Sequence, residues 1–200
     1  MRTNYVLVDL ENVQPDSLDA LAQDHFKILL FVGANQTKLP FDLVASMQRL
    51  GPHAEYIKIS GNGSNALDFH IAYTVGRIAA AEPTAYFHVV SKDTGFDPLI
   101  QHLKTQKVFA GRVKSIGDIP LVKASTAKSP AERLDVVLAW LERTKASKPR
   151  TLKTLTSTIA SLFQKQLADS EVAALIDALA NEERLTVNGT KVTYPAPTGS

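Results

Sequence analysis

The chain has 200 residues, of which 44% are hydrophobic and 21% are charged, and its ten glycines and ten prolines exclude a collagen-like, low-complexity or largely disordered protein. The absence of cysteine excludes disulfides, thiolate metal sites and cysteine nucleophiles and fits a cytosolic location, and no apolar run reaches the roughly 18 residues of a transmembrane helix. The net charge of +2 is the sum of an acidic and a basic half: residues 1–100 contain 7 Lys/Arg and 11 Asp/Glu, and residues 101–200 contain 15 Lys/Arg and 9 Asp/Glu. This asymmetry indicates different roles for the two halves.

Apolar runs of strand length alternate with amphipathic helical patterns through the first 120 residues. The runs are continuous, which is typical of strands that are covered by helices on both faces. The strand-like runs are Tyr5–Leu10, Lys27–Val32, Glu55–Ile59 and Ala85–Ser91, with a fifth within Lys107–Lys114. The helical patterns are Leu18–Gln23, Phe41–Leu50, Asn65–Ala81 and Pro98–Thr105. We therefore predict an open, mostly parallel α/β sheet, in which sites form at the C-terminal ends of the strands.

A second, smaller α+β domain is predicted after a polar linker. Residues 123–129 are small and polar, so we place the first domain at 1–122 and the second at 130–195. The predicted elements of the second domain are helices over Pro130–Thr144, Leu152–Gln166 and Ser170–Glu182 and a hairpin over Leu185–Tyr194. Asn188 and Gly189 predict a type I′ turn, because both residues tolerate a positive φ. Three helices followed by a hairpin are typical of a winged helix-turn-helix domain.

Acidic residues fall where an α/β sheet builds its site. Asp9 lies near the C-terminal end of the first strand-like run, Asp93 follows the fourth, and Asp97 falls in the first turn of the next helix. Asp68 comes three residues after a predicted N-cap at Asn65, on a helix face that also carries core residues. We expect these four carboxylates to converge at one edge of the sheet. Neighbouring carboxylates repel one another unless a cation neutralises them, and oxygen ligands favour Mg²⁺ or Mn²⁺.

Three segments then carry a family resemblance: VDLENV, ALDFHIAY and SKDTGFDPLI resemble, in order and spacing, the acidic motifs of the PIN-like superfamily, particularly its NYN branch. The resemblance covers about residues 4–120 and implies a Rossmann-like nuclease domain that cleaves RNA with Mg²⁺ or Mn²⁺. By motif, the catalytic and metal-binding carboxylates would be Asp9, Asp68, Asp93 and Asp97, and the accessory residues Asn12, Ser91 and Glu11. The second domain resembles the winged-helix modules that accompany some NYN domains.

Two further groups are candidates for nucleic-acid contact. The loop residues Gly61, Gly63, Ser64 and Asn65 would let backbone N–H groups approach a phosphate, although a plain connecting turn explains the same glycines. In the second domain the basic candidates are Lys145, Lys148, Arg150 and Lys153, with Lys191 on the predicted wing. Such clusters are typical of contacts to a phosphate backbone, although solubility and protein docking are alternative roles.

The leading hypothesis is a metal-dependent endoribonuclease that acts on RNA rather than DNA, with the winged helix recruiting the substrate. The alternatives are a non-catalytic RNA- or DNA-binding protein on the same fold, a DNA nuclease with the same carboxylates, and a protein-docking scaffold. Triad hydrolases and P-loop NTPases are excluded, because no GxSxG or Walker A motif occurs. A haloacid phosphatase is disfavoured, because Glu11 stands where its second Asp would be. We expect no membrane partner, and a homodimer is compatible with the sequence.

Overall fold

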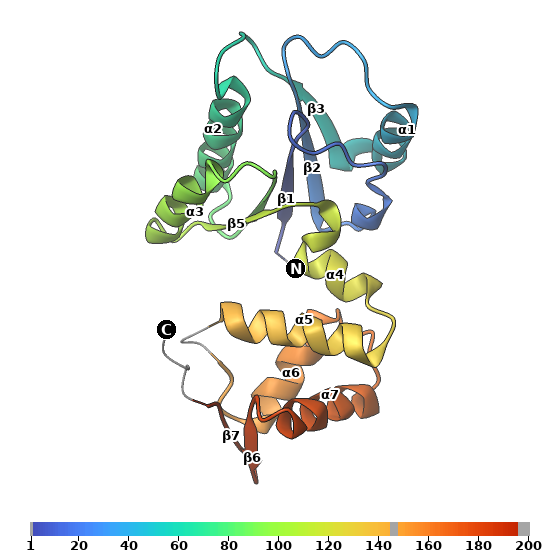
Figure 1. Cartoon of the computed structure of the whole chain (residues 1–200), viewed down its shortest axis with the longest axis vertical. Coiled ribbons are helices and arrows are strands. Elements are labelled where there is room, and N and C mark those ends of the chain that lie inside the picture. Colours follow the sequence, from blue (N-terminus) through green and yellow to red (C-terminus); the bar gives the residue numbers. More distant parts are fainter. Residues whose placement is uncertain (1, 145–147, 196–200) are drawn as a thin grey trace. The chain divides into compact units, whose positions relative to one another are not determined.

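The computed structural model describes residues 2–144 and 148–195. The chain forms two compact units, the first ending at Ile119 and the second beginning at Pro120 (Figure 1). The strands of the first unit are β1 (Asn4–Asp9), β2 (Phe26–Val32), β3 (Ala54–Lys58), β4 (Tyr86–Val90) and β5 (Phe109–Val113). They form one sheet in the order β3-β2-β1-β4-β5, and every neighbouring pair is parallel. This confirms the predicted α/β fold.

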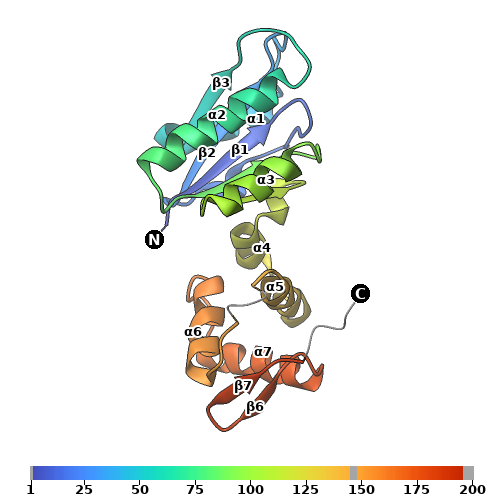
Figure 2. The ribbon, with the colours of Figure 1, turned by 90° about the vertical axis from the view of Figure 1, so that its left-hand side faces the viewer.

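Helices cover both faces of this sheet (Figures 1 and 2). The helices of the first unit are α1 (Phe41–Leu50), α2 (Ala66–Ala81) and α3 (Phe96–Thr105), with short 3-10 turns at Asp19–Leu21, Gly51–His53 and Ile116–Asp118. Figure 1 shows α2 and α3 on one side of the sheet and α1 on the other. On the α2 side, Leu7, Phe31 and Phe87 from the three central strands pack in one core with Ile71 and Ile100. The 3-10 turn replaces the helix that was predicted over Leu18–Gln23.

The sheet topology places a natural site beside β1. The chain adds β2 and β3 on one side of β1 and then crosses to add β4 and β5 on the other, so the direction of winding reverses between β1 and β4. Ligands of open α/β sheets bind outside the carboxyl ends of the strands at such a reversal. Val8 is in register with Val90, which brings Asp9 and Ser91 side by side at this point.

The second unit contains four helices and a hairpin among its described residues. These elements are α4 (Pro120–Thr126), α5 (Pro130–Arg143), α6 (Leu152–Leu162), α7 (Asp169–Asn181), β6 (Thr186–Asn188) and β7 (Lys191–Thr193). The segment that was predicted as a linker, 123–129, is therefore partly helical, because Val122 and Ala124 are buried and hold α4 within this unit. Ser129 and Glu132 form a capping box that starts α5 where the sequence places it.

The β6–β7 hairpin lies where it was expected, but its turn differs from the prediction. Asn188 pairs with Lys191 in the ladder, so the two-residue loop consists of Gly189 and Thr190. Of these residues, Gly189 has a positive φ of 61°, and Asn188 and Thr190 do not. A positive φ at the first loop position is the pattern of a type II′ turn rather than type I′. None of the described helices combines the length and apolar composition that crossing a bilayer requires.

Candidate active site

Asp9 is a fully buried carboxylate at the C-terminal end of the central strand β1. Its Oδ1 accepts hydrogen bonds from the backbone N–H groups of Glu11 and Asn12, at 3.1 and 3.2 Å. Its Oδ2 accepts from Asn12 Nδ2 and Ser91 Oγ, both at 2.7 Å. These four donors fill the acceptor positions of the carboxylate, so a buried negative charge is held in one orientation.

Ser91 connects this carboxylate to the next one. The Ser91 hydroxyl donates to Asp9 and accepts a hydrogen bond from the backbone N–H of Asp93, at 3.0 Å. Asp93 Oδ1 in turn accepts from the backbone N–H of Gly95, at 2.7 Å. A Cβ on residue 95 would lie 3.1 Å from the same oxygen, so the absence of a side chain there leaves room for the carboxylate. Two predicted site residues, Asp9 and Asp93, are therefore linked through a third.

Asp68 faces these groups from the first turn of α2. Burial raises the pKa of Asp68 above its ordinary value of 3.8, and the neighbouring charges of Asp9, Asp93 and Glu11 raise it further. The structure thus places Asp68 within electrostatic reach of three other predicted carboxylates, those of Asp9, Asp93 and Glu11. Asn65 occupies the N-cap position of α2 as predicted, but its φ of 62° is left-handed and its side chain makes no capping hydrogen bond.

Asp97 differs from the other predicted carboxylates because it forms an ion pair. It lies in the first turn of α3 as predicted, but both of its carboxylate oxygens accept hydrogen bonds from Arg112, at 2.7 and 3.0 Å. This pairing holds the pKa of Asp97 below its ordinary value. A third bond runs from Arg112 Nη1 to the carbonyl oxygen of Ser91, at 3.2 Å. Our sequence reasoning missed Arg112, whose one available signal was its position near the end of the last strand.

The chemistry of these side chains fits a hard divalent cation. The donors are all oxygens, and both burial and the neighbouring carboxylates raise the pKa of Asp68, so a cation would stabilise its charged form. Among the described residues, no three His, Asp or Glu side chains are already arranged as a ligand set. Mg²⁺ usually keeps several waters and takes one or two carboxylates together with substrate phosphates, so a three-carboxylate cage is not required. Acceptor positions remain open on Asp68, Asp93 and Glu11.

Comparison with known families decides the assignment: the model of a PIN domain, PIN7, matches residues 3–113. The chain belongs to the PIN domain family. PIN domains are generally nucleases, often metal-dependent ribonucleases, and the acidic edge described above lies within the matched segment. No curated protein matches the chain. Assignment to the NYN branch stays a prediction, as does the winged-helix assignment of the second unit.

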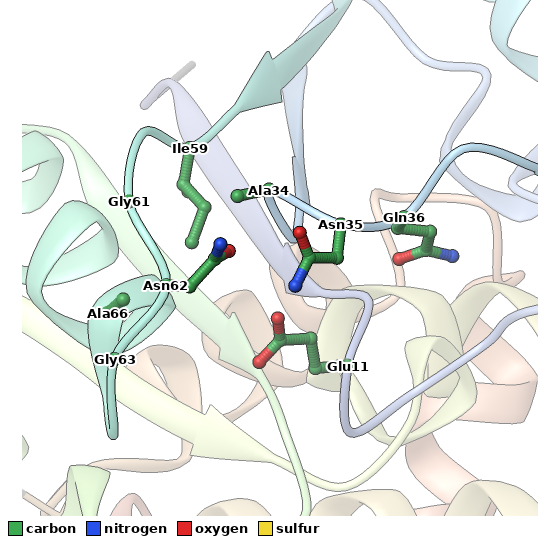
Figure 3. Close-up of a pocket in the computed structure, with 9 residues that line it drawn as sticks. All are labelled: Glu11, Ala34, Asn35, Gln36, Ile59, Gly61, Asn62, Gly63 and Ala66. Carbon is green, nitrogen blue, oxygen red and sulfur yellow. The ribbon is translucent and has the colours of Figure 1, made fainter.

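Next to the carboxylates, the PIN domain contains an open pocket of about 260 Å³ (Figure 3). Glu11 forms one wall, the segment after β2 contributes Asn35, and the loop before α2 contributes Asn62. Gly61 and Gly63 of the predicted phosphate loop also line this pocket. Contact of the loop residues Gly61, Gly63, Ser64 and Asn65 with a phosphate stays a prediction.

The exposed face of α2 in the PIN domain carries two aromatic side chains that our sequence reasoning did not single out. Phe69 and Tyr73 are 69% and 70% exposed, and their spacing of four residues places them on one face of the helix. Phe69 directly follows Asp68 in the chain. Apolar residues occur on almost every side of α2, so its sequence does not distinguish the buried face of the helix from the exposed one.

In the second unit, pairing of β7 with the segment before α6 brings the predicted basic residues close together. The backbone N–H of Leu152 donates to Thr190, and that of Val192 donates to Arg150, at 2.8 and 2.9 Å. These bonds bring Lys191 beside the start of α6, which follows Lys148 and Arg150 and contains Lys153. Arg150, Lys153 and Lys191 are exposed, and Lys148 is partly buried over the ring of Tyr194. Lys145 lies outside the described residues.

Proposed function

We propose that this PIN-family protein is a metal-dependent endoribonuclease that hydrolyses RNA phosphodiester bonds at the edge formed by Asp9, Asp68 and Asp93, with Mg²⁺ or Mn²⁺ as the cation. The observation that carries the proposal is the Asp9–Ser91–Asp93 hydrogen-bond chain facing Asp68, whose pKa is raised by burial and further by the neighbouring carboxylates. Structural ion pairs relieve charge, whereas this arrangement concentrates it, which is typical of a site that receives a cation.

In this proposal each side chain has a separate task. Asp68 and Asp93, with open acceptor positions, would hold the cation, and Glu11 is placed to assist them. When bound, such a cation activates water and offsets the charge that develops on the phosphate oxygens. Asp9 supplies a buried charge whose direction is fixed by Ser91 and the amide of Asn12.

Arg112 would be a positioning residue. Its guanidinium donates to both carboxylate oxygens of Asp97 and at the same time to the carbonyl oxygen of Ser91. Because Ser91 donates to Asp9 and accepts from Asp93, displacement of this segment would move both carboxylates. The Asp97 carboxylate therefore acts through Arg112 and not as a direct ligand.

The rest of the molecule supports binding of a polynucleotide. Lys148, Arg150, Lys153 and Lys191 give the second unit a basic edge suited to a phosphate backbone, as in a winged-helix module that recruits the substrate. On the PIN domain, exposed aromatic rings such as Phe69 and Tyr73 are suited to stacking on unpaired bases. Unpaired bases are more common in RNA than in duplex DNA, which favours RNA as the substrate.

The test is cleavage of end-labelled single-stranded and hairpin RNAs, with DNA of the same sequences alongside, in Mg²⁺, Mn²⁺ or EDTA. Asp93→Asn should abolish metal-dependent cleavage, while Asp42→Asn, an exposed carboxylate in the first turn of α1, should leave it unchanged. Cleavage of DNA in preference to RNA would show a DNA nuclease instead. Binding that persists in EDTA, without cleavage, would show a non-catalytic nucleic-acid-binding protein.

A further inference from the structure

The pocket beside the acidic edge has a chemical character of its own. The side chains of Glu11, Asn35 and Asn62 come from three separate segments and point toward a common space (Figure 3). The carboxamides of Asn35 and Asn62 have no hydrogen-bond partner elsewhere in the described part of the chain, so their donors and acceptors are available to a ligand. Ala34, Ile59 and Ala66 add apolar surface. The pocket thus combines neutral polar groups, one carboxylate and an apolar wall.

The side chains that line the pocket determine which kind of ligand it can bind. A carboxamide offers a donor and an acceptor side by side, which matches the edge of a nucleobase. The carboxylate of Glu11 accepts from base N–H groups but repels phosphate. Within this pocket, a phosphate would also find no lysine or arginine among the lining residues. The lining therefore favours an uncharged, hydrogen-bonding ring with apolar faces over an anion.

Size and position indicate which part of a ligand is bound. About 260 Å³ is slightly below the roughly 300–1,000 Å³ of sites that enclose a whole small molecule, so the pocket suits one unit of a longer chain. Glu11 is the connection to the acidic edge, because its backbone N–H donates to Asp9 Oδ1 at 3.1 Å. Ala66, which also lines the pocket, precedes Asp68 by two residues in α2. A Cβ on residue 33 would overlap Glu11 Oε1, so the absence of a side chain on Gly33 leaves room for this carboxylate.

We propose that this pocket receives the base of one nucleotide that adjoins the scissile phosphate, with Asn35 and Asn62 contacting the base edge, and that it makes cleavage depend on the identity of that nucleotide. The inference rests on the proposed endoribonuclease function and adds a specificity subsite to it. Asn35 and Asn62 are specificity residues in this view, and the carboxylates carry the chemistry.

Cleavage of a random-sequence RNA pool, with sequencing of the product ends, tests this directly. The wild-type protein should prefer one nucleotide at one position beside the cut by about 5- to 50-fold, the discrimination expected of a good base contact. Asn62→Ala and Asn35→Ala should flatten that preference while cleavage continues. Gln48→Ala, which removes an exposed carboxamide from α1, is the matched control and should retain the preference. No preference in the wild type, or one that both variants retain, would overturn the proposal.

A second readout separates this proposal from the proposed function. Isotope-labelled full-length protein is titrated with each of the four uncharged nucleosides, and the side-chain amide signals of Asn35 and Asn62 are followed by NMR. If the wild type cleaves no RNA, the endoribonuclease proposal fails and the titration decides about the pocket. Shifts of these two signals would then show that the pocket binds a nucleoside. Shifts confined to other residues, or no shifts, would overturn the proposal for the pocket.

Discussion

Arg112 and Asp97 form a two-pronged ion pair, with Nε donating to Oδ1 at 2.7 Å and Nη2 donating to Oδ2 at 3.0 Å. The Arg112 side chain is 13% exposed and that of Asp97 is 50% exposed, so one partner is largely shielded from water. The pair joins β5 to the first turn of α3, and the third bond of Arg112 reaches the segment after β4. One guanidinium thus fixes three pieces of backbone around the acidic edge.

Arg112→Ala should therefore lower the free energy of unfolding by about 1–3 kcal/mol, because it removes charge-assisted hydrogen bonds from a largely shielded donor. Urea unfolding followed by circular dichroism measures the change. Arg49→Ala is the matched control, since Arg49 pairs with Asp19 with both side chains more than half exposed, and it should lower the stability clearly less than Arg112→Ala does. Equal losses in the two variants would contradict the role given to Arg112.

The same variant has a defined pH dependence. The pKa of Asp97 is lowered in the folded protein, so the pair stabilises the fold above the ordinary value of 3.8 and this contribution is lost as the pH falls through the lowered pKa. The difference in unfolding free energy between wild type and Arg112→Ala should shrink below about pH 4. A difference that stays constant down to pH 2 would show that the ion pair is not its source.

Asp68→Asn should have opposite effects on stability and on activity. The raised pKa of Asp68 means that its charged form destabilises the folded protein, and this cost grows as the pH rises from 3.8 through the raised pKa. Without added metal at pH 7, the free energy of unfolding of the variant should exceed that of the wild type by about 0.5–2 kcal/mol. Cleavage should fall by more than about 100-fold, since even outer partners of a metal ligand contribute about 10–100-fold.

Both effects of Asp68→Asn are measured on the same preparation, by urea unfolding in EDTA and by RNA cleavage in Mg²⁺. The stability gain should vanish when the unfolding is repeated at pH 3. A variant that is destabilised at pH 7 would show that Asp68 has a favourable partner in the folded protein and would argue against a cation site.

Divalent metal should stabilise the wild-type fold. A ligand that binds only the folded state, present at about 100 times its dissociation constant, raises the free energy of unfolding by about 2.7 kcal/mol. For a chain of this size this corresponds to a rise in Tm of roughly 5–11 °C. The measurement is thermal unfolding in a Mg²⁺ or Mn²⁺ series, with Ca²⁺ and EDTA as references. Asp93→Asn should reduce the rise strongly. The same rise in the variant would place metal binding elsewhere.

Much of this architecture follows from local signals, whereas its cross-links do not. Asp9 was predicted because it ends a buried parallel strand and Asp93 because it follows another, and such strand ends meet at one edge of the sheet. The pairing of Asp97 depends on the register that sets Arg112 beside Val89, and nothing within SKDTGFD specifies it. The turn type likewise depends on the pairing of Asn188 with Lys191. Local composition predicts elements and strand-end positions, whereas tertiary register decides which of these residues pair.

The aromatic pair on α2 gives a test of substrate contact. Phe69→Ala and Tyr73→Ala should each weaken binding of single-stranded RNA by roughly 5- to 100-fold, since stacking contributes about 1–3 kcal/mol per base. Folding should change by less than about 0.5 kcal/mol, because both rings are exposed. Phe41→Ala is the control: this ring is 82% exposed but belongs to α1, on the opposite face of the sheet. Fluorescence anisotropy on the Asp93→Asn background measures binding without cleavage.

The basic edge of the second unit should show itself in the salt dependence of binding. Each phosphate contact to single-stranded RNA contributes about 0.7 to the slope of log K against log salt, so Lys153→Gln should lower the slope by roughly that amount. Lys165→Gln, beyond the other end of α6, should leave the slope unchanged. Equal slopes in both variants and the wild type would favour a protein-docking role for this unit.

The hydrogen bond between Asp9 and Ser91 spans 82 residues of chain. Contacts so distant in sequence form only after a large part of a domain has collapsed, and synthesis delivers the N-terminal strands first. While β1, β2 and β3 are already available, Asp9 still lacks Ser91, and Asp93 is not yet beside it. The proposed site is therefore completed only when β4 joins the sheet, so a partly synthesised or truncated chain that stops before β4 contains Asp9 and Asp68 but lacks Ser91 and Asp93.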